Sequence, residues 1–387
     1  IALVGHGWAV TFGSMGSSYF SIQLVTGIPG DMIGPHMALL FGIPIVASGI
    51  LVAHLQSGWT GVRRATPLVI VVGTLMASCM WLMAWIGAPQ IASSVPGIIA
   101  IAGVGILART PLFIRDPANP ERERKIISDI PGGQGRQSTP GFNLGFLPYY
   151  LLIALSIIAQ LPAVKESVAN VTWGLDYPMT ITNLGFIVNA SENYAAIRLF
   201  NHPAPLIMIS IGVSIIAYRL ASRWQPGAVT DSLRLTYKQS LPTTIGVSTM
   251  VMMALIMADS GMTTVLAQGI AQSSGPIFPL VSPFIGLMGS FMTGSNTNSN
   301  VMFGLLQVET ARSLEIGTIT IASVQSLGAS LGSSLAPTKV MVGAAIVGIA
   351  GREGEIMRMI MPYILGLVLL AGIEAIILVR LIPEWTR

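Results

Sequence analysis

The sequence predicts an all-α protein that crosses a lipid bilayer many times. Of its 387 residues, 52% are hydrophobic and 9% are charged, whereas an ordinary soluble domain carries about 25% charged residues. So few charges cannot cover a surface that faces water, but a surface that faces lipid does not need them. The apolar residues are spread along the chain in segments, which favours one membrane domain over several soluble domains.

Nine apolar stretches are long enough to cross a bilayer, which takes about 20 helical residues. They lie at 1–25, 34–54, 67–88, 93–109, 144–164, 204–222, 241–266, 316–350 and 359–381. The first and the eighth are rich in glycine and serine, and the eighth is too long for one plain crossing. We therefore expect these two stretches to be broken helices.

The loop charges predict the orientation of these helices, because cytoplasmic loops carry more Lys and Arg than external ones. Basic residues follow the second, fourth, sixth and eighth stretches, whereas the loop 165–203 is poor in them. This alternation requires the segment 277–306 to enter and leave on the external side. We therefore predict a re-entrant helical hairpin at 277–306, with its tip at the polar run GSNTNSN, residues 294–300.

A short internal repeat predicts an inverted-repeat fold. The sequence SMGSS at 14–18 matches SLGSS at 330–334 in four of five positions, and the two stretches have opposite predicted orientations, as in inverted-topology repeats. We expect one membrane transport domain over 1–387. It comprises the end of repeat one at 1–54, scaffold helices and loops at 67–222, and repeat two at 241–381. The hairpin of repeat one would fall before Ile1, so we expect an N-terminally truncated chain.

The hairpin tip and the two helix breaks form the candidate binding site. Helix N-termini carry partial positive charge and attract anions, and Ser, Thr and Asn donate hydrogen bonds without the desolvation cost of a full charge. A small carboxylate is the natural ligand. The alternative is that these residues only join helices. The candidate residues are Ser14, Gly16, Ser17, Ser18, Ser295, Asn296, Thr297, Asn298, Ser299, Asn300, Ser330, Gly332, Ser333, Ser334 and Lys339.

Ionisable residues inside the predicted membrane segments are candidates for proton coupling. They are His6, Asp259 and Lys339, and Lys339 is also placed to pair with a substrate carboxylate. Glu374 lies in the last helix. A structural role is the alternative for each. We expect no cofactor and no metal, since the lone Cys79 excludes a CxxC metal site.

Two other classes of protein are disfavoured. Gly328-Ala329-Ser330-Leu331-Gly332 fits the nucleophile elbow of hydrolases, but that motif needs a strand, a turn and a helix in an α/β sheet. We therefore do not expect an enzyme. The formal charge of +4 comes from the short loops, and no basic patch is interleaved with aromatic residues, so nucleic acid is not an expected partner.

Three segments resemble the lactate permease family: Gly5 to Gly16, Phe291 to Asn300, and Ser333 to Glu353. The resemblance covers nearly the whole chain. It implies proton symport of lactate and related 2-hydroxymonocarboxylates such as glycolate across the bacterial plasma membrane. The chain is also distantly similar to the sodium/dicarboxylate carriers of the ion-transporter superfamily, which carry Ser-Asn-Thr at paired hairpin tips. By that similarity Ser295, Asn296 and Thr297 form the second tip.

The chain departs from the family pattern at two candidate residues. Asn296 stands where some lactate permeases have Asp, and Lys339 stands where some have a neutral residue. The expected function is proton-coupled uptake of a small monocarboxylate by a membrane-embedded secondary transporter. The alternatives are a sodium-coupled or other organic-anion carrier, or an anion channel. Carriers of this build are often homodimers, by analogy.

Overall fold

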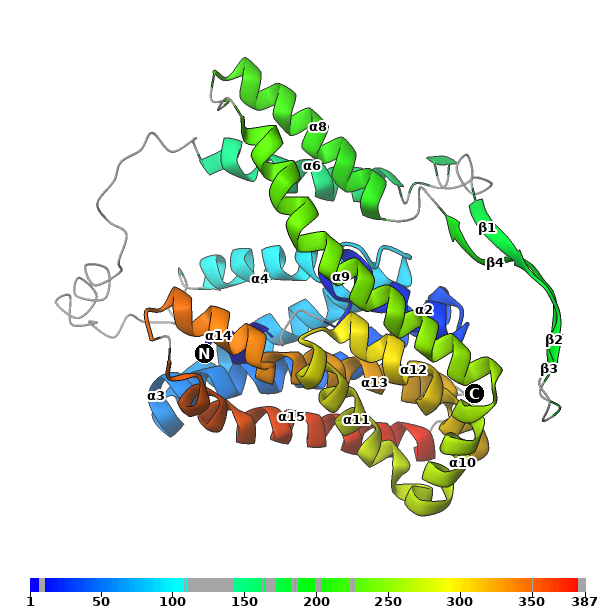
Figure 1. The fold of residues 1–387 in the computed structure, drawn as a ribbon. Helices are drawn as coiled ribbons and strands as arrows, with labels where there is room; N and C mark the ends of the chain where they lie inside the picture. Colours follow the sequence, from blue (N-terminus) through cyan, green and yellow to red (C-terminus); the bar gives the residue numbers. More distant parts are fainter. Residues whose placement is uncertain are drawn as a thin grey trace.

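A computed structural model of the chain confirms an all-α membrane protein (Figure 1). It describes residues 1–6, 11–107, 109, 142–159, 161, 163–164, 172–181, 185, 187–198, 203–222, 224, 227–349 and 351–381. The helices are α1 Ala2–His6, α2 Ser17–Thr26, α3 Gly30–Trp85, α4 Ser94–Leu107, α6 Phe142–Ala159, α8 Pro203–Leu220, α9 Ala228–Asp259, α10 Met262–Ser274, α11 Phe278–Thr293, α12 Asn296–Ser313, α13 Thr318–Gly332, α14 Pro337–Ile346 and α15 Glu353–Leu381. Within the described residues, short 3-10 helices lie between them: η1 Ser14–Gly16, η3 Gly275–Ile277 and η4 Ser333–Leu335.

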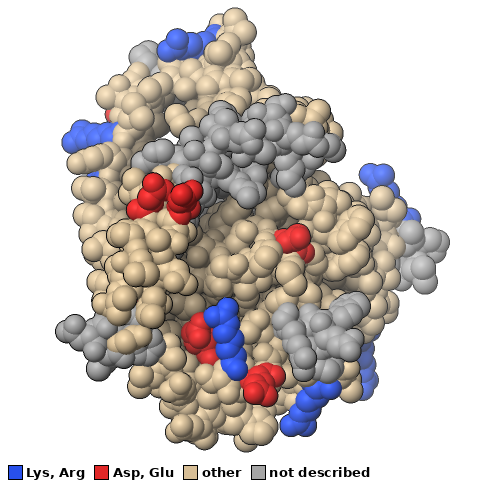
Figure 2. All heavy atoms as spheres, turned by 90° about the vertical axis from the view of Figure 1, so that its right-hand side faces the viewer, with Lys and Arg blue, Asp and Glu red and all other residues tan. Residues whose placement is uncertain are grey.

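Three helical segments of the described chain are long and apolar enough to cross a membrane: Gly30–Trp85, Met262–Thr293 and Glu353–Leu381. Shorter apolar helices lie at Ser94–Leu107, Asn143–Ala159, Ala204–Leu220 and Thr244–Asp259. Figure 2 shows one face of the molecule, on which a few charged side chains are scattered over an otherwise uncharged surface. Large apolar side chains are widely exposed, as lipid contact requires.

Helix α3 is a pair of antiparallel arms rather than one long rod. Ser57 and Gly58 have non-helical backbone angles. A β-carbon added to Gly73 would lie 2.9 Å from Val46 Cγ2, and one added to Gly42 would lie 3.8 Å from Ala77 Cβ. The two arms correspond to the predicted stretches 34–54 and 67–88. The residues predicted to form the loop between them are instead mostly helical, with the reversal confined to Ser57 and Gly58.

The segment predicted to be an external loop, 165–203, contains β-structure that the sequence reading missed. Strands β1 (Thr172–Tyr177) and β4 (Ser191–Arg198) pair antiparallel, and β2 (Thr180–Ile181) pairs antiparallel with β3 (Ile187–Val188). In Figure 1 they form a ribbon that extends along the side of the helices. The basic loop expected after the fourth stretch lies outside the described residues.

Helix α13 is the centre of the molecule, and every residue from Ile319 to Gly332 is buried. It packs against α3, α11, α12 and α15. Its glycines allow a very close approach to α11. A β-carbon added to Gly332 would lie 2.6 Å from Leu287 Cα, and one added to Gly328 would lie 2.6 Å from Pro283 Cα. The apparent hydrolase motif at 328–332 is therefore a small-xxx-small helix contact within α13.

We predict that Gly328→Val destabilises the fold, because its side chain would overlap the α11 backbone. Overpacking of this kind costs about 1–3 kcal/mol or more. Thermal unfolding in detergent should show a lower Tm for Gly328→Val. The matched control is Gly366→Val on α15, where an added β-carbon meets nothing within 4 Å. Equal Tm values for the two variants would contradict the close helix contact.

Candidate functional site

The polar run at 294–300 forms a tight helical hairpin, but most of it is helix. Helix α11 ends at Thr293, Gly294 adopts a left-handed conformation with φ 74°, and Ser295 is the N-cap of α12. The Ser295 hydroxyl accepts a hydrogen bond from the backbone N–H of Asn298 at 3.3 Å. The predicted tip is thus reduced to Gly294 and Ser295, and Asn296 to Asn300 form the first turns of α12.

Both predicted helix breaks are present. Helix α1 ends at His6, η1 follows at Ser14–Gly16, and α2 begins at Ser17. Helix α13 ends at Gly332, η4 follows, and α14 begins at Pro337 after an extended Ala336 with ψ 129°.

The sequence match between the two breaks does not extend to their backbones. Gly16 is left-handed with φ 80°, whereas the matching Gly332 is helical with φ −62°. The inverted repeat stays a prediction.

The start of α12 lies directly against the first break. Thr297 Oγ1 donates a hydrogen bond to Ser17 Oγ at 3.2 Å and lies 3.5 Å from Ser18 Oγ. Asn300 Nδ2 donates to the Ser18 carbonyl at 3.0 Å, and Asn296 Nδ2 donates to the Thr11 carbonyl at 3.4 Å. Two predicted parts of the site, whose contacting residues are 279 to 282 positions apart in the sequence, therefore meet.

The second break lies against the other side of the hairpin turn. A β-carbon added to Gly294 would lie 2.7 Å from Thr338 Oγ1, in the first turn of α14. The N-terminal ends of α2, α12 and α14 thus converge at this turn. Each end carries the partial positive charge of a helix dipole. In α2 the first backbone N–H groups already donate to the carbonyls of Ser14 and Phe12, so α2 contributes its dipole rather than free N–H groups. The convergence creates a region suited to an anion.

Lys339 adds a cationic group beside the second break. Its Nζ donates a hydrogen bond to Ser333 Oγ at 3.0 Å, and Ser333 Oγ donates to the Ser330 carbonyl at 2.8 Å. The buried hydroxyls of Ser330 and Ser334 make no hydrogen bond within the described residues, so they are available to a ligand. The predicted residue Ser14 is exposed.

The other ionisable candidates lie in different surroundings. Asp259, at the end of α9, accepts a 2.8 Å hydrogen bond from the Tyr177 hydroxyl of β1. It is therefore engaged by the β-ribbon rather than by the hairpin turn. His6 is the last residue of α1, and its side chain lies outside the described part of the chain. Glu374 is buried in α15, with 9% of its surface exposed.

A buried amide network, which the sequence reading missed, holds the hairpin on α13. Gln307 of α12 donates to Gln325 Oε1 of α13 and to the Ser282 carbonyl of α11. Gln325 Nε2 donates to Ser299 Oγ at 3.1 Å, and Ser299 Oγ donates to the Gly286 carbonyl at 2.8 Å. The available signal was the presence of two glutamines within apolar helices.

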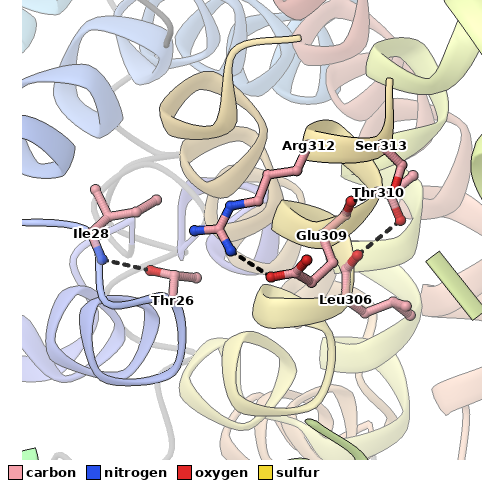
Figure 3. A network of polar contacts seen from close by, with 7 residues as sticks. All are labelled: Thr26, Ile28, Leu306, Glu309, Thr310, Arg312 and Ser313. Atoms are coloured by element: carbon pink, nitrogen blue, oxygen red, sulfur yellow. Dashed lines mark hydrogen bonds and ion pairs between the residues drawn. The ribbon is translucent and has the colours of Figure 1, made fainter. Parts of the chain in front are cut away.

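The C-terminal end of α12 is also polar, but its polar side chains form an ion pair outside the candidate site. Arg312 Nη1 pairs with Glu309 Oε1 at 2.5 Å, with 55% of the arginine side chain exposed. Figure 3 shows this pair beside the turn at Thr26 and Ile28, where the Thr26 hydroxyl accepts from the Ile28 N–H. Such an exposed pair contributes little to stability. It marks the end of the hairpin arm that lies away from the candidate site.

These features define an α-helical membrane protein with a polar site between a helical hairpin and two helix breaks. The chain belongs to the L-lactate permease family, whose model matches residues 1–382. This match confirms the resemblance seen in the sequence motifs, and it places the chain in a family of permeases.

Several known proteins are similar over most of the chain. The L-lactate permease of Escherichia coli (strain K12) is 24% identical, over 99% of this chain and 71% of the relative. The L-lactate permease of Salmonella typhimurium is 22% identical over the same shares. The glycolate permease GlcA of Escherichia coli (strain K12) is 24% identical, over 92% of this chain and 66% of the relative. No solved structure matches the chain.

We predict that Gln325→Leu destabilises the protein, because Gln307 loses the Gln325 oxygen that accepts its amide N–H, and Ser299 loses the Gln325 N–H that donates to its hydroxyl and carbonyl. Each such group costs about 1–3 kcal/mol. The measurement is unfolding in detergent, by heat or denaturant. Gln268→Leu on α10 is the matched control, since Gln268 is exposed. If both variants unfold at the same point as the wild type, the amide network does not hold the hairpin.

Proposed function

We propose that the chain is a secondary active transporter that takes up L-lactate and related 2-hydroxymonocarboxylates, including glycolate, by proton symport. The proposed location is the bacterial plasma membrane. The observation that carries the proposal is the convergence of three helix N-termini, those of α2, α12 and α14, at the hairpin turn. The names of the relatives, L-lactate permease and glycolate permease, support the substrate class.

The chemistry of this region suits a hydroxylated monocarboxylate. A carboxylate is stabilised by helix N-termini and by hydroxyl donors. Ser17 and Thr297 supply hydroxyls at the α2–α12 contact, and the amide of Asn300 supplies both a donor and an acceptor. The buried Asn300 Oδ1 accepts no hydrogen bond from the described residues. It is therefore suited to accept a bond from the 2-hydroxyl group of the substrate.

We propose that alternating access moves this site across the membrane. The moving part would comprise 1–54 and 241–381 together with the second arm of α3, which packs against the first arm, and the rest of the segment 67–222 would be the scaffold. In Figure 1, α6 and α8 pair with each other above the other helices, and the long helix α9 links them to the hairpin region. This arrangement is compatible with motion of one part against the other, as in carriers with broken helices.

Two alternatives follow from the same site. Asn296 is neutral, so the site itself holds no carboxylate that would carry a proton, and this favours sodium as the alternative coupling ion.

An anion channel would need a continuous polar pore, whereas the polar groups here gather at the helix breaks. Uptake of radiolabelled L-lactate into proteoliposomes, with imposed proton or sodium gradients, separates these functions, because a channel cannot accumulate solute against its gradient.

We predict that the double substitution Asn296→Ala with Thr297→Ala lowers L-lactate uptake by about tenfold or more, since each lost hydrogen bond to a charged ligand is worth about 1.5–3 kcal/mol. The measurement is initial uptake rate in proteoliposomes that contain equal amounts of protein. Ser313→Ala at the far end of α12 is the control and should behave as the wild type. Unchanged uptake by the double variant would remove the hairpin turn from the binding site.

We predict that Lys339→Met raises the KM for L-lactate several-fold, because it removes a positive charge beside the anion site. Lys238→Met, at an exposed position of α9, is the matched control. Uptake is measured over a range of L-lactate concentrations, and KM is compared between the variants. A KM equal to that of the control would show that Lys339 serves only to hold Ser333.

A further inference from the structure

Glu374 is an acidic residue on the inward face of a membrane helix. It lies on the stripe by which α15 packs against the core, together with the buried residues Leu367, Val368, Ala371 and Ala375. Next to it, Gly372 brings α15 into close contact with α11, since a β-carbon added to Gly372 would lie 2.6 Å from the Leu280 carbonyl oxygen. Glu374 is therefore an interior residue rather than a side chain at the surface.

The carboxyl group of Glu374 has no hydrogen-bond partner in the described part of the chain. Both oxygens are buried, and neither makes a hydrogen bond there. Glu374 lies seven residues before the end of α15 at Leu381, which is about 10 Å along a helix. An isolated ionised carboxylate in such a place is very costly. The group is therefore favoured in its neutral form, with a proton bound.

The charged side chains described on α3, α11, α13 and α14 do not offset this cost. Neither 278–293 nor 318–332, the segments of α11 and α13, contains a charged residue. On α3, the ring nitrogen Nδ1 of His54 lies 3.0 Å from the Tyr363 hydroxyl of α15. Tyr363 is eleven residues before Glu374, which is about 16 Å along the helix. The remaining α3 charges are Asp31, His36, Arg63 and Arg64. On α14, Lys339 is bound to Ser333.

Glu374 belongs to the same packed unit as the candidate binding site without being part of it. Its helix contacts α11 and α13, which carry the hairpin. Gly372 contacts α11 at Leu280. Leu280 is fourteen residues before the turn at Gly294, which is about 21 Å along a helix. A charge change at Glu374 would therefore act on the unit that carries the substrate, not on the substrate directly.

We propose that Glu374 is the residue that carries the coupled proton, an inference that rests on the proposed symport. The substrate-loaded unit would cross between its two orientations only while the Glu374 carboxyl is protonated, because a bare carboxylate and the bound anion together would carry two negative charges through the apolar interior. After the proton and the anion have left, the empty unit would return with Glu374 ionised, and the positive charge of Lys339 in the same unit would keep its net charge near zero, so that the cycle closes. In each cycle the carboxyl binds one proton from water on one side and releases it to water on the other. One monocarboxylate anion moves with that proton, so the charges balance and no substrate bond changes.

The test compares net transport with exchange in proteoliposomes that contain Glu374→Gln. The glutamine mimics the protonated carboxyl and cannot release a proton. We expect proton-driven accumulation of L-lactate to be lost, so that the ratio of internal to external L-lactate falls to about one. Exchange of internal for external L-lactate needs no proton release, and it should stay within about twofold of the wild type. Glu315→Gln, at an exposed position after α12, should keep both activities.

Each other outcome is decisive. Proton-driven accumulation of L-lactate by Glu374→Gln would overturn the assignment. Loss of both exchange and accumulation, in folded protein of unchanged Tm, would also overturn it, because it would indicate a role in transport itself. A lowered Tm would also overturn it, because a neutral glutamine should replace a neutral carboxyl without loss. If the wild-type protein transported no L-lactate in either assay, the proposed function would fail. If it accumulated L-lactate with sodium alone, only the proton assignment would fail.

Discussion

The close contact between the backbones of α11 and α13 is the constraint on which the rest of the structure depends. Gly328 and Gly332 leave no room for side chains between the two helices, and Gly286 provides the matching surface on α11, where an added β-carbon would lie 2.9 Å from the Ala329 backbone nitrogen. In lipid there is little hydrophobic drive to join helices, so such small-residue contacts determine their packing. This contact fixes the first arm of the hairpin.

The second arm is fixed by hydrogen bonds, and the two kinds of contact make the hairpin and α13 one unit. Gln307 and Gln325 link α12 to α13, and Ser299 links it to the backbone of α11. In a water-free interior each of these groups is costly to leave unpaired. Opening the hairpin away from α13 would break all of these bonds together. Substrate access is therefore better explained by motion of the whole unit than by the hairpin acting as a separate gate.

The sequence predicted the class of fold, both helix breaks and the hairpin, because each leaves a local signal: long apolar stretches, glycine with serine, or a polar run between apolar arms. It failed where the outcome depended on contacts across the fold. The helical start at Asn296 is an exception, because it had a local signal that the prediction overlooked: Gly294 ends α11 and Ser295 caps α12. The pairing of Asp259 with Tyr177 joins residues 82 apart. The buried role of Gln325 likewise depends on its partners in other helices.

The polar groups that can hold an anion and the carboxyl group that can bind a proton lie in different places within the same unit. The hairpin turn gathers neutral donors and three helix N-termini, which can hold an anion without placing a permanent charge in the membrane. An acidic side chain at that turn would repel the anion, and Asn296 stands there instead. A titratable carboxyl can occur in the same unit only at a distance from the anion and in a place that keeps it neutral. Glu374 meets both conditions, because it is buried on α15 and packs behind the helices that carry the turn.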